Sequence, residues 1–295
     1  MSGIRMHADE IDIDVPLVVR LIAEQFPAWA ALPVRKVRSA GTDNAMFRLG
    51  EELVVRLPRI PDAAGQVEKE QRWLPYLAPH LPLRVPAPLG RGVPAVGFPF
   101  AWSVYGWLDG EDAFGATLAD PGRAAAELGR FVAALRRVEA AGGPPSFRGG
   151  PVSGLDDYVR AAIRDLGADQ AAVTAAWEEV LGLPQWEDAP VWVHSDLLPG
   201  NLLLERGRLS AVIDFGAVGV GDPACDMLAA WTLLGADTRG RFRECAEVDE
   251  ATWARGRGWA LAWGLVADHH YRATNPVLAT VGRRAVTEAL VDRRV

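Results

Sequence analysis

Apolar residues near the start of the chain recur at the spacing of one helix face. Leu17, Leu21 and Ile22 share this face, and their spacing is that of an amphipathic helix. Asp14 precedes them, and its side chain is suited to capping the free backbone N–H groups of a first helical turn. The pattern predicts an opening helix at residues 14–26.

Apolar and polar residues then alternate, as they do in half-buried strands. The alternation occurs in three short runs separated by turn-forming residues, at 34–40, 45–49 and 52–57. It predicts two antiparallel hairpins in succession. Apolar residues return to helical spacing at 63–77, and the aromatic segment 98–108 has the composition of a buried strand.

The second half of the chain carries mostly helical patterns. Alanine-rich segments with helical spacing occupy 121–141 and 153–181, and helices are expected again from Cys225 onward. A β-rich interruption separates these helical regions. Its strand-like runs are 191–193, 202–204 and 209–213.

The order of these elements predicts the fold class. Runs of strands followed by runs of helices are typical of an α+β fold, here in two lobes. We place a β-rich N-terminal lobe at residues 1–107 and a helical C-terminal lobe at 108–295. Prolines between 79 and 88 are expected to leave that stretch without regular structure, because proline lacks the N–H that helices and inner strands use.

The composition is that of a globular protein with an acidic balance. The chain has 295 residues, of which 49% are hydrophobic, enough to bury a core in each of two lobes. Its formal net charge is −7. This acidity argues against nucleic acid as a partner, because phosphate backbones require basic surfaces, and it is compatible with a cationic substrate.

The sequence also bears on compartment and assembly. No basic segment followed by an apolar one opens the chain, and the most apolar stretch, at 259–267, is too short to span a bilayer. The two cysteines, Cys225 and Cys245, have no spacing typical of metal ligands. We therefore expect a cytoplasmic protein without a membrane partner. A monomer or homodimer is also expected.

The segment 191–216, VWVHSDLLPGNLLLERGRLSAVIDFG, carries the candidate chemistry. Asp196 lies in a Pro-Gly loop, Asn201 opens the next strand, and Asp214 ends its hairpin partner. Magnesium is a hard cation that prefers such oxygen ligands, and it neutralises the phosphate oxygens during phosphoryl transfer. A further carboxylate is needed near the attacking hydroxyl to accept or orient its proton.

Each of these residues has a purely structural interpretation when taken alone. Asp196 would suit a cap, Asn201 a turn, and Asp214 a turn closed by its own side chain. Their order is more specific than any one of them. It matches the kinase-type set of a catalytic Asp, a metal-binding Asn and a metal-binding Asp.

With HSDLLPGN, VIDFG and GDPACDML in this order, the chain resembles the aminoglycoside phosphotransferase family, which has a protein-kinase-like fold. The resemblance extends more weakly over most of the chain. It implies that Asp196 is the catalytic base and that Asn201 and Asp214 bind magnesium. It also implies that His194 supports the catalytic loop and that Asp226 hydrogen-bonds that loop.

The resemblance also implies a nucleotide site in the N-terminal lobe. Kinase-like folds place a basic residue, usually lysine in this family, on the third strand and pair it with a helix glutamate; the matching residue here is Arg56, in LVVRLP. We expect Glu70 to be its partner, with Glu68 as the alternative. An exposed strand position is the other interpretation of Arg56. Further nucleotide contacts are expected from a turn that stands in place of a glycine-rich loop and from a hinge: Ser39, Thr42, Asn44, Tyr105 and Trp107.

The acceptor is expected to be a small molecule. Only seven residues separate Asp214 from Asp222, too few for the activation segment and peptide platform of a regulated protein kinase. The family's acceptor site lies in the helical lobe and is often lined by acidic and aromatic residues. Candidates are Asp156, Asp157, Trp231, Asp237, Trp263, Asp268 and Tyr271. Asp157, Trp231 and Asp268 are preferred among them.

Three functions remain in competition. The first is a kinase that uses Mg²⁺ and ATP, with GTP as the alternative, to inactivate an antibiotic. The second is a metabolic kinase acting on a choline-like, sugar or amino-alcohol hydroxyl. The third is a catalytically silent nucleotide-binding protein, suggested by Arg56 in place of lysine. A metal hydrolase is less favoured, because the His194 motif lacks further histidines at ligand spacing.

Overall fold

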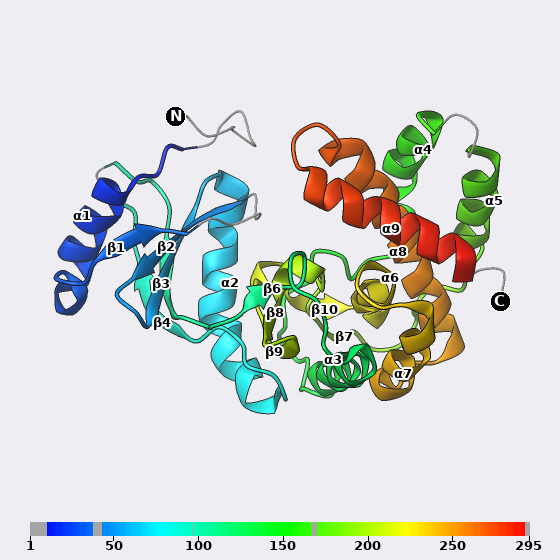
Figure 1. The fold of residues 1–295 in the computed structure, drawn as a ribbon, viewed down its shortest axis with the longest axis horizontal. Helices are drawn as coiled ribbons and strands as arrows, with labels where there is room; N and C mark the ends of the chain where they lie inside the picture. Colours follow the sequence, from blue (N-terminus) through cyan, green and yellow to red (C-terminus); the bar gives the residue numbers. More distant parts are fainter. Residues whose placement is uncertain (1–10, 38–42, 96, 167–169, 293–295) are drawn as a thin grey trace. The chain divides into compact units, whose positions relative to one another are not determined.

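A computed structural model describes residues 11–37, 43–95, 97–166 and 170–292 (Figure 1). The described chain separates into two compact units. The first contains the residues up to Pro79, together with Arg84–Asp109 and Ile213–Gly216. The second contains His80–Leu83, Gly110–Val212 and the residues from Ala217 onward. The four-residue segment Ile213–Gly216 thus belongs with the first unit although its neighbours in sequence belong to the second.

The first unit is built on an antiparallel sheet of five strands in the order β1-β2-β3-β5-β4 (Figure 1). The strands are β1 (Val34–Lys36), β2 (Asn44–Leu49), β3 (Leu53–Pro58), β4 (Pro88–Gly92) and β5 (Trp102–Gly106). Two helices accompany the sheet, α1 (Val15–Gln25) and α2 (Pro61–Leu77). The predicted hairpins of β1–β2 and β2–β3 are therefore present.

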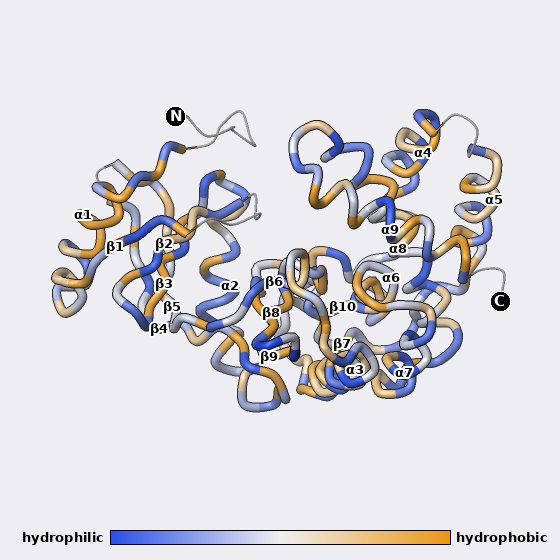
Figure 2. Tube along the Cα trace, viewed as in Figure 1, coloured by the Kyte–Doolittle hydropathy of each residue, from blue (hydrophilic) through white to orange (hydrophobic). Residues whose placement is uncertain are grey.

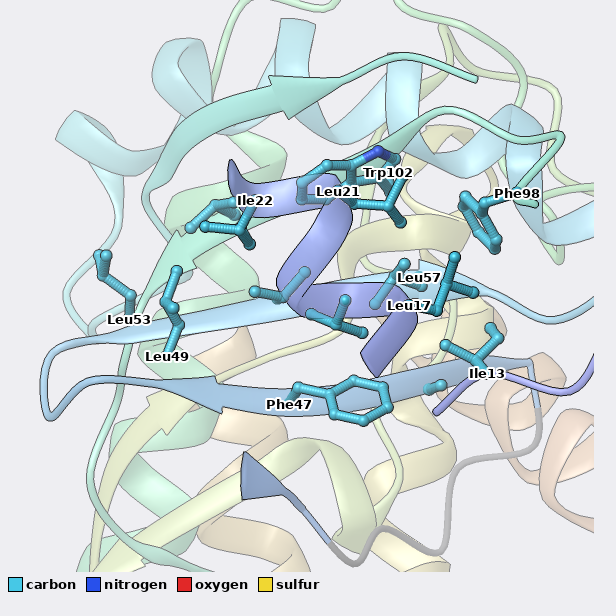
Figure 3. Close-up of a cluster of buried hydrophobic side chains, with 14 residues drawn as sticks. Ile13, Leu17, Leu21, Ile22, Phe47, Leu49, Leu53, Leu57, Phe98 and Trp102 are labelled. Carbon is cyan, nitrogen blue, oxygen red and sulfur yellow. The ribbon is translucent and has the colours of Figure 1, made fainter. Parts of the chain in front are cut away.

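The core of this unit lies between α1 and the sheet (Figure 3). Leu17, Leu21 and Ile22 of α1 are buried in one cluster with Phe47 of β2. Asp14 caps α1, because its Oδ1 accepts a hydrogen bond from the Leu17 N–H at 2.9 Å. The apolar spacing and the capping residue therefore specify this helix as predicted.

One strand of this sheet was not expected. Pro88–Gly92 forms β4, although the prolines before and within it were predicted to exclude regular structure. β4 is an edge strand, and its pairing with β5 shifts between Pro88 and Gly90. A proline at the start of an edge strand needs no N–H for a further neighbour, which is why the sheet tolerates it.

The second unit is mostly helical, and its sheets are small. Its described α-helices are α3 (Pro121–Arg136), α4 (Asp156–Arg164), α5 (Gln170–Leu181), α6 (Ala229–Thr232), α7 (Ala236–Ala246), α8 (Glu250–Tyr271) and α9 (Pro276–Asp292). β6 (Glu111–Asp112), β8 (Leu202–Glu205) and β9 (Arg208–Val212) form one sheet, and β7 (Val191–Val193) pairs with β10 (Gly219–Gly221). The α+β class predicted from the sequence is confirmed.

Hydrophobic and hydrophilic residues are interspersed along the helices of this unit (Figure 2). Even α8, which runs for 22 residues, includes charged positions. Among the described residues, no helix combines the length and the apolar character that crossing a bilayer requires.

Helices α8 and α9 cross closely because glycine faces glycine. A Cβ atom added at Gly264 would lie 2.6 Å from the Gly282 carbonyl oxygen, and one at Gly282 would lie 2.7 Å from the Gly264 oxygen. Real Cβ contacts are essentially never below 3.0 Å, so either side chain would force the two backbones apart.

Gly264→Ala is therefore expected to lower the free energy of unfolding by about 1–3 kcal/mol, the usual cost of overpacking. Urea denaturation measures the change. Gly240→Ala is the matched control, because Gly240 is also helical, in α7, but nothing lies within 4 Å of its added Cβ. The control is expected to gain up to about 1 kcal/mol from helix propensity. Equal effects of the two substitutions would contradict this account of the crossing.

Candidate active site

The loop after β7 is anchored by Asp226, from the 3₁₀ segment Pro223–Leu228. Its Oδ2 accepts the His194 backbone N–H at 2.8 Å and its Oδ1 accepts the Ser195 backbone N–H at 2.7 Å. All three residues are completely buried. Asp226 therefore makes the loop contacts that the resemblance implies.

The burial of Asp226 changes its acidity. Burial raises the pKa of the Asp226 carboxyl to about 7, although the hydrogen bonds from His194 and Ser195 and the charge of Arg136 oppose this shift. Desolvation disfavours the ionised form of a carboxyl group, whereas N–H donors favour it. Here desolvation has the larger effect.

His194 and Ser195 shape the loop from within. The Asp196 backbone N–H donates to His194 Nδ1 at 3.2 Å, so Nδ1 is the unprotonated ring nitrogen. Ser195 has a φ of 72°, in the left-handed region that non-glycine residues seldom occupy. Strained backbone of this kind is concentrated at functional sites. His194 thus supports the loop, as expected, and is not itself exposed.

The Asp196 carboxylate is held at both oxygens. Arg148 Nη1 donates to its Oδ1, and Asn201 Nδ2 donates to its Oδ2 at 2.9 Å. The side chain is 24% exposed, so it is fixed in orientation and still accessible. A carboxylate in this state can accept or orient the proton of an incoming hydroxyl group.

Arg148 was not identified from the sequence. Its Nη1 also donates to the Ser195 carbonyl oxygen at 2.6 Å, and its backbone N–H donates to Ser195 Oγ at 2.6 Å. It lies 48 residues before Asp196 in the chain, in a loop without motif character. The two glycines that follow Arg148 are the one local feature that could have drawn attention to it, and glycine pairs are too common in loops to indicate a functional residue.

The loop that carries Arg148 is fixed by β10. Val220 donates its N–H to the Pro144 carbonyl oxygen at 2.8 Å and accepts from the Ser146 N–H at 3.1 Å. The approach is close enough that a Cβ added at Gly221 would lie 2.5 Å from the Gly149 Cα. The glycines of β10, which has no strand-like sequence pattern, are therefore needed to place Arg148.

The side-chain amide of Asn201 is held by the same loop. Its Nδ2 donates to the Asp196 carbonyl oxygen at 2.8 Å as well as to Oδ2. Both amide hydrogens are thereby used, and the amide oxygen is left as the remaining polar atom. An amide oxygen is a ligand that suits magnesium. Among the described residues, no group of three or more His, Cys, Asp or Glu side chains is placed to hold a metal ion.

In the first unit, Arg56 projects from β3 to a buried glutamate on α2. Its Nη1 donates to both carboxylate oxygens of Glu70, at 2.6 and 2.7 Å, and Glu70 is only 2% exposed. Glu68 pairs with Arg91 instead. The pairing of Arg56 with Glu70 is therefore confirmed, and the alternative of an exposed Arg56 is wrong.

Arg56 has two further partners. Its Nη2 donates to Asp214 Oδ1, and the amide oxygen of Asn44, turned toward the guanidinium, accepts from Nη2 at 3.0 Å and from Nε at 3.2 Å. Asp214 has a φ of 63°, again left-handed. Burial lowers the pKa of Arg56, but the carboxylates of Asp214 and Glu70 raise it above its ordinary value, so the group stays charged.

The other residues predicted to bind nucleotide differ in their surroundings. Tyr105 is buried, and its hydroxyl donates to Glu70 Oε2 at 2.7 Å, so its side chain is not available to a ligand. Trp107 is half-buried, with the Arg48 guanidinium 3.8 Å from its ring centre. Ser39 and Thr42 lie outside the described residues.

Comparison with known proteins identifies the family. The model of the phosphotransferase enzyme family matches residues 34–259. The chain belongs to this family. The prediction of a phosphotransferase that acts on a hydroxyl group of a small molecule is thereby confirmed. The protein-kinase-like fold is confirmed as well.

Individual relatives differ in how much of the chain they match. The uncharacterized protein YcbJ of Bacillus subtilis is 26% identical over 72% of this chain and 71% of its own length. An aminoglycoside 3′-phosphotransferase of Escherichia coli is 33% identical, but over only 21% of this chain and 23% of its own.

Solved structures show the fold shared over nearly the whole chain. The GDP complex of wild-type aminoglycoside 2′-phosphotransferase-IIIa has a TM-score of 0.69 and 18% identity, covering 95% of this chain and 100% of that one. Macrolide 2′-phosphotransferase MphH from Brachybacterium faecium has a TM-score of 0.63 and 23% identity, covering 90% and 97%.

One predicted acceptor residue of this phosphotransferase belongs to the core. Trp231 is fully buried, its ring centre lies 4.6 Å from that of Trp253, and its Nε1–H donates to Asp292 Oδ2 at 3.2 Å. Helical spacing alone does not distinguish a core tryptophan from one that lines a site. A substrate has no access to this ring, so the predicted acceptor role of Trp231 is wrong.

The two acidic residues predicted to contact the acceptor differ in whether arginines pair with them. Asp268 is only 18% exposed and pairs with Arg283 at 2.6 Å and with Arg272 at 3.7 Å. Asp157 is exposed, in the first turn of α4. Because Asp268 is already neutralised by two arginines, Asp157 is the better candidate for attracting a cationic acceptor.

Arg148→Ala is expected to lower kcat by about 10²-fold, because it releases one oxygen of the Asp196 carboxylate and misplaces the group. The KM for nucleotide is expected to change little. Arg148→Lys restores the charge and should recover part of the loss. Steady-state kinetics measure both constants, with the exposed Arg208→Ala as the control. An unchanged kcat in Arg148→Ala would show that Arg148 does not position Asp196.

Proposed function

We propose that this phosphotransferase transfers the γ-phosphate of ATP or GTP to a hydroxyl group of an antibiotic, with magnesium as cofactor. The observation that carries the proposal is the Asp196 carboxylate, which is accessible and held at both oxygens by Arg148 and Asn201. In this role it accepts or orients the proton of the acceptor hydroxyl as the phosphoryl group is transferred.

Asn201 and Asp214 are proposed as the magnesium ligands. Each offers an oxygen of the kind that magnesium prefers: an amide oxygen oriented by the loop in one case, and a 40% exposed carboxylate in the other. When bound, the metal neutralises negative charge on the phosphate oxygens. Arg56, held by the buried Glu70, is proposed to contact the nucleotide phosphates.

The nucleotide and acceptor are proposed from similar proteins. Neighbouring structures are described as complexes with GDP, with ADP or with ATP. One of these also contains kanamycin, another structure contains gentamicin, and a further one is a macrolide phosphotransferase. These likenesses favour an antibiotic acceptor. A metabolic hydroxyl compound of choline-like, sugar or amino-alcohol type is the alternative, since the same catalytic groups would serve it.

The arrangement of the loop argues against a silent nucleotide-binding protein. Such a protein has no need to hold a carboxylate by an arginine and an asparagine at the end of a buried strand. We further propose that the protein acts in the cytoplasm, as a monomer or homodimer.

A two-stage screen tests the proposed function. Thermal-shift titration with ATP and GTP, each with and without Mg²⁺, first identifies the nucleotide. The purified protein is then incubated with the preferred nucleotide and a panel of aminoglycosides, macrolides and metabolic alcohols, and nucleoside diphosphate release is measured. Acceptor-dependent release supports the proposal. Binding of nucleotide without any acceptor-dependent release across the panel would favour the silent nucleotide-binding protein.

A further inference from the structure

All the hydrogen-bond donors of Arg56 are occupied within the first unit. A guanidinium group has five N–H donors. Nη1 uses two on the Glu70 oxygens, Nη2 uses two on Asp214 and Asn44, and Nε uses one on Asn44. In this state Arg56 has no donor left for a phosphate oxygen.

The partner that Nη2 holds is also the proposed metal ligand. Asp214 Oδ1 accepts from Nη2, and the Asp214 side chain is 40% exposed, far more than the 2% of Glu70. Of the two carboxylates around Arg56, Asp214 is therefore the one that an incoming cation reaches. Glu70 stays with Arg56, because it is buried and also bound by the Tyr105 hydroxyl.

The charges of Arg56, Glu70 and Asp214 also favour binding of a cation before a phosphate. One guanidinium and two carboxylates sum to a charge of −1, counted over Arg56, Glu70 and Asp214. A metal-free nucleotide phosphate would add negative charge to this sum, whereas a divalent cation at Asp214 reverses its sign. Because Arg56 and Glu70 are nearly buried, these interactions are weakly screened by solvent.

We infer that Arg56 makes nucleotide binding depend on the metal through an exchange of partners at Nη2. The cation takes Asp214, and the Nη2 hydrogen released from Asp214 then binds a phosphate oxygen. The inference rests on the proposed use of magnesium and nucleotide. A lysine has three donors on one nitrogen in place of five on three nitrogens, so it is expected to commit fewer donors to Glu70 and Asp214 and to depend less on the metal.

The test compares metal dependence in two proteins, without any turnover. The dissociation constant of a fluorescent ADP or GDP analogue is measured in excess Mg²⁺ and in EDTA. For the wild type, binding in EDTA is expected to be at least about 10²-fold weaker. For Arg56→Lys this ratio is expected to fall at least tenfold, mainly because binding in EDTA becomes tighter. Arg91→Lys is the control, as an arginine of the same unit paired with the exposed Glu68.

A second variant covers the case in which Arg56→Lys does not fold. Asn44→Ala removes the amide that occupies Nε and part of Nη2, so it frees donors for phosphate and is expected to lower the ratio several-fold. A ratio within twofold of the wild type in the folded variants would overturn the inference. Absence of binding even with Mg²⁺ would instead reject the proposed nucleotide site, and the inference with it.

Discussion

Asp196→Asn is expected to reduce phosphate transfer by about 10²–10⁴-fold, the usual contribution of a general base. The amide keeps the size of the side chain but cannot accept a proton. It also presents an N–H₂ group to Arg148 or Asn201, both of which donate to the carboxylate in the wild type. Binding of the magnesium–nucleotide complex is expected to remain within about threefold of the wild type, because Arg56, and not Asp196, is the residue proposed to contact the nucleotide phosphates.

Steady-state kinetics and nucleotide titration separate these two effects. Glu187→Gln serves as the control, since Glu187 is an exposed carboxylate of the same unit. A loss of nucleotide binding that accounts for the whole loss of turnover would contradict the role given to Asp196. Turnover equal to that of the wild type would reject it outright.

Asp226→Ala is expected to have the largest effect on stability. It leaves the His194 and Ser195 N–H groups buried without an acceptor. Each unsatisfied buried donor costs about 1–3 kcal/mol, so the free energy of unfolding should fall by roughly 2–6 kcal/mol. Urea denaturation measures the change. A loss below about 1 kcal/mol would show that the loop does not depend on this carboxylate.

The pH dependence of the Asp226 effect follows from its raised pKa. Its pKa is about 7 in the folded protein and near the ordinary 3.8 when unfolded. Between these values the folded state binds a proton that the unfolded state has lost. The stability contributed by this group is therefore fully present below about pH 4 and is lost as the pH rises through 7. The wild type should lose stability relative to the non-titrating Asp226→Asn over this window. A wild type that gains stability relative to Asp226→Asn as the pH rises would contradict this sign.

Features encoded by adjacent residues could be predicted from the sequence. The spacing of Leu17, Leu21 and Ile22 and the cap at Asp14 specify α1, because each depends only on residues within a few positions. The hairpin of β2 and β3 follows from alternation in the same way. The pairing of Arg56 with Glu70 followed from the family resemblance, which supplies long-range information that periodicity lacks.

Features created by contacts between distant segments could not be predicted. β4 exists because an edge position tolerates proline, and β10 because its glycines allow another loop to approach. Neither the edge position of β4 nor the approach of the loop to β10 can be inferred from the neighbouring residues in the sequence. Arg148 reaches Asp196 from another loop, and the burial of Trp231 depends on packing against Trp253. Sequence patterns give the type of side chain at these positions but not its neighbours.

The central claim is that a small-molecule hydroxyl receives a phosphoryl group through the action of Asp196. Mass spectrometry of the acceptor after incubation with Mg²⁺ and the γ-phosphate donor tests it most directly. We predict that an acceptor incubated with the wild type gains the mass of one phosphoryl group, and that the same acceptor incubated with Asp196→Asn does not. Equal amounts of phosphorylated acceptor from the two proteins, or nucleotide hydrolysis to free phosphate with no phosphorylated acceptor, would contradict the claim.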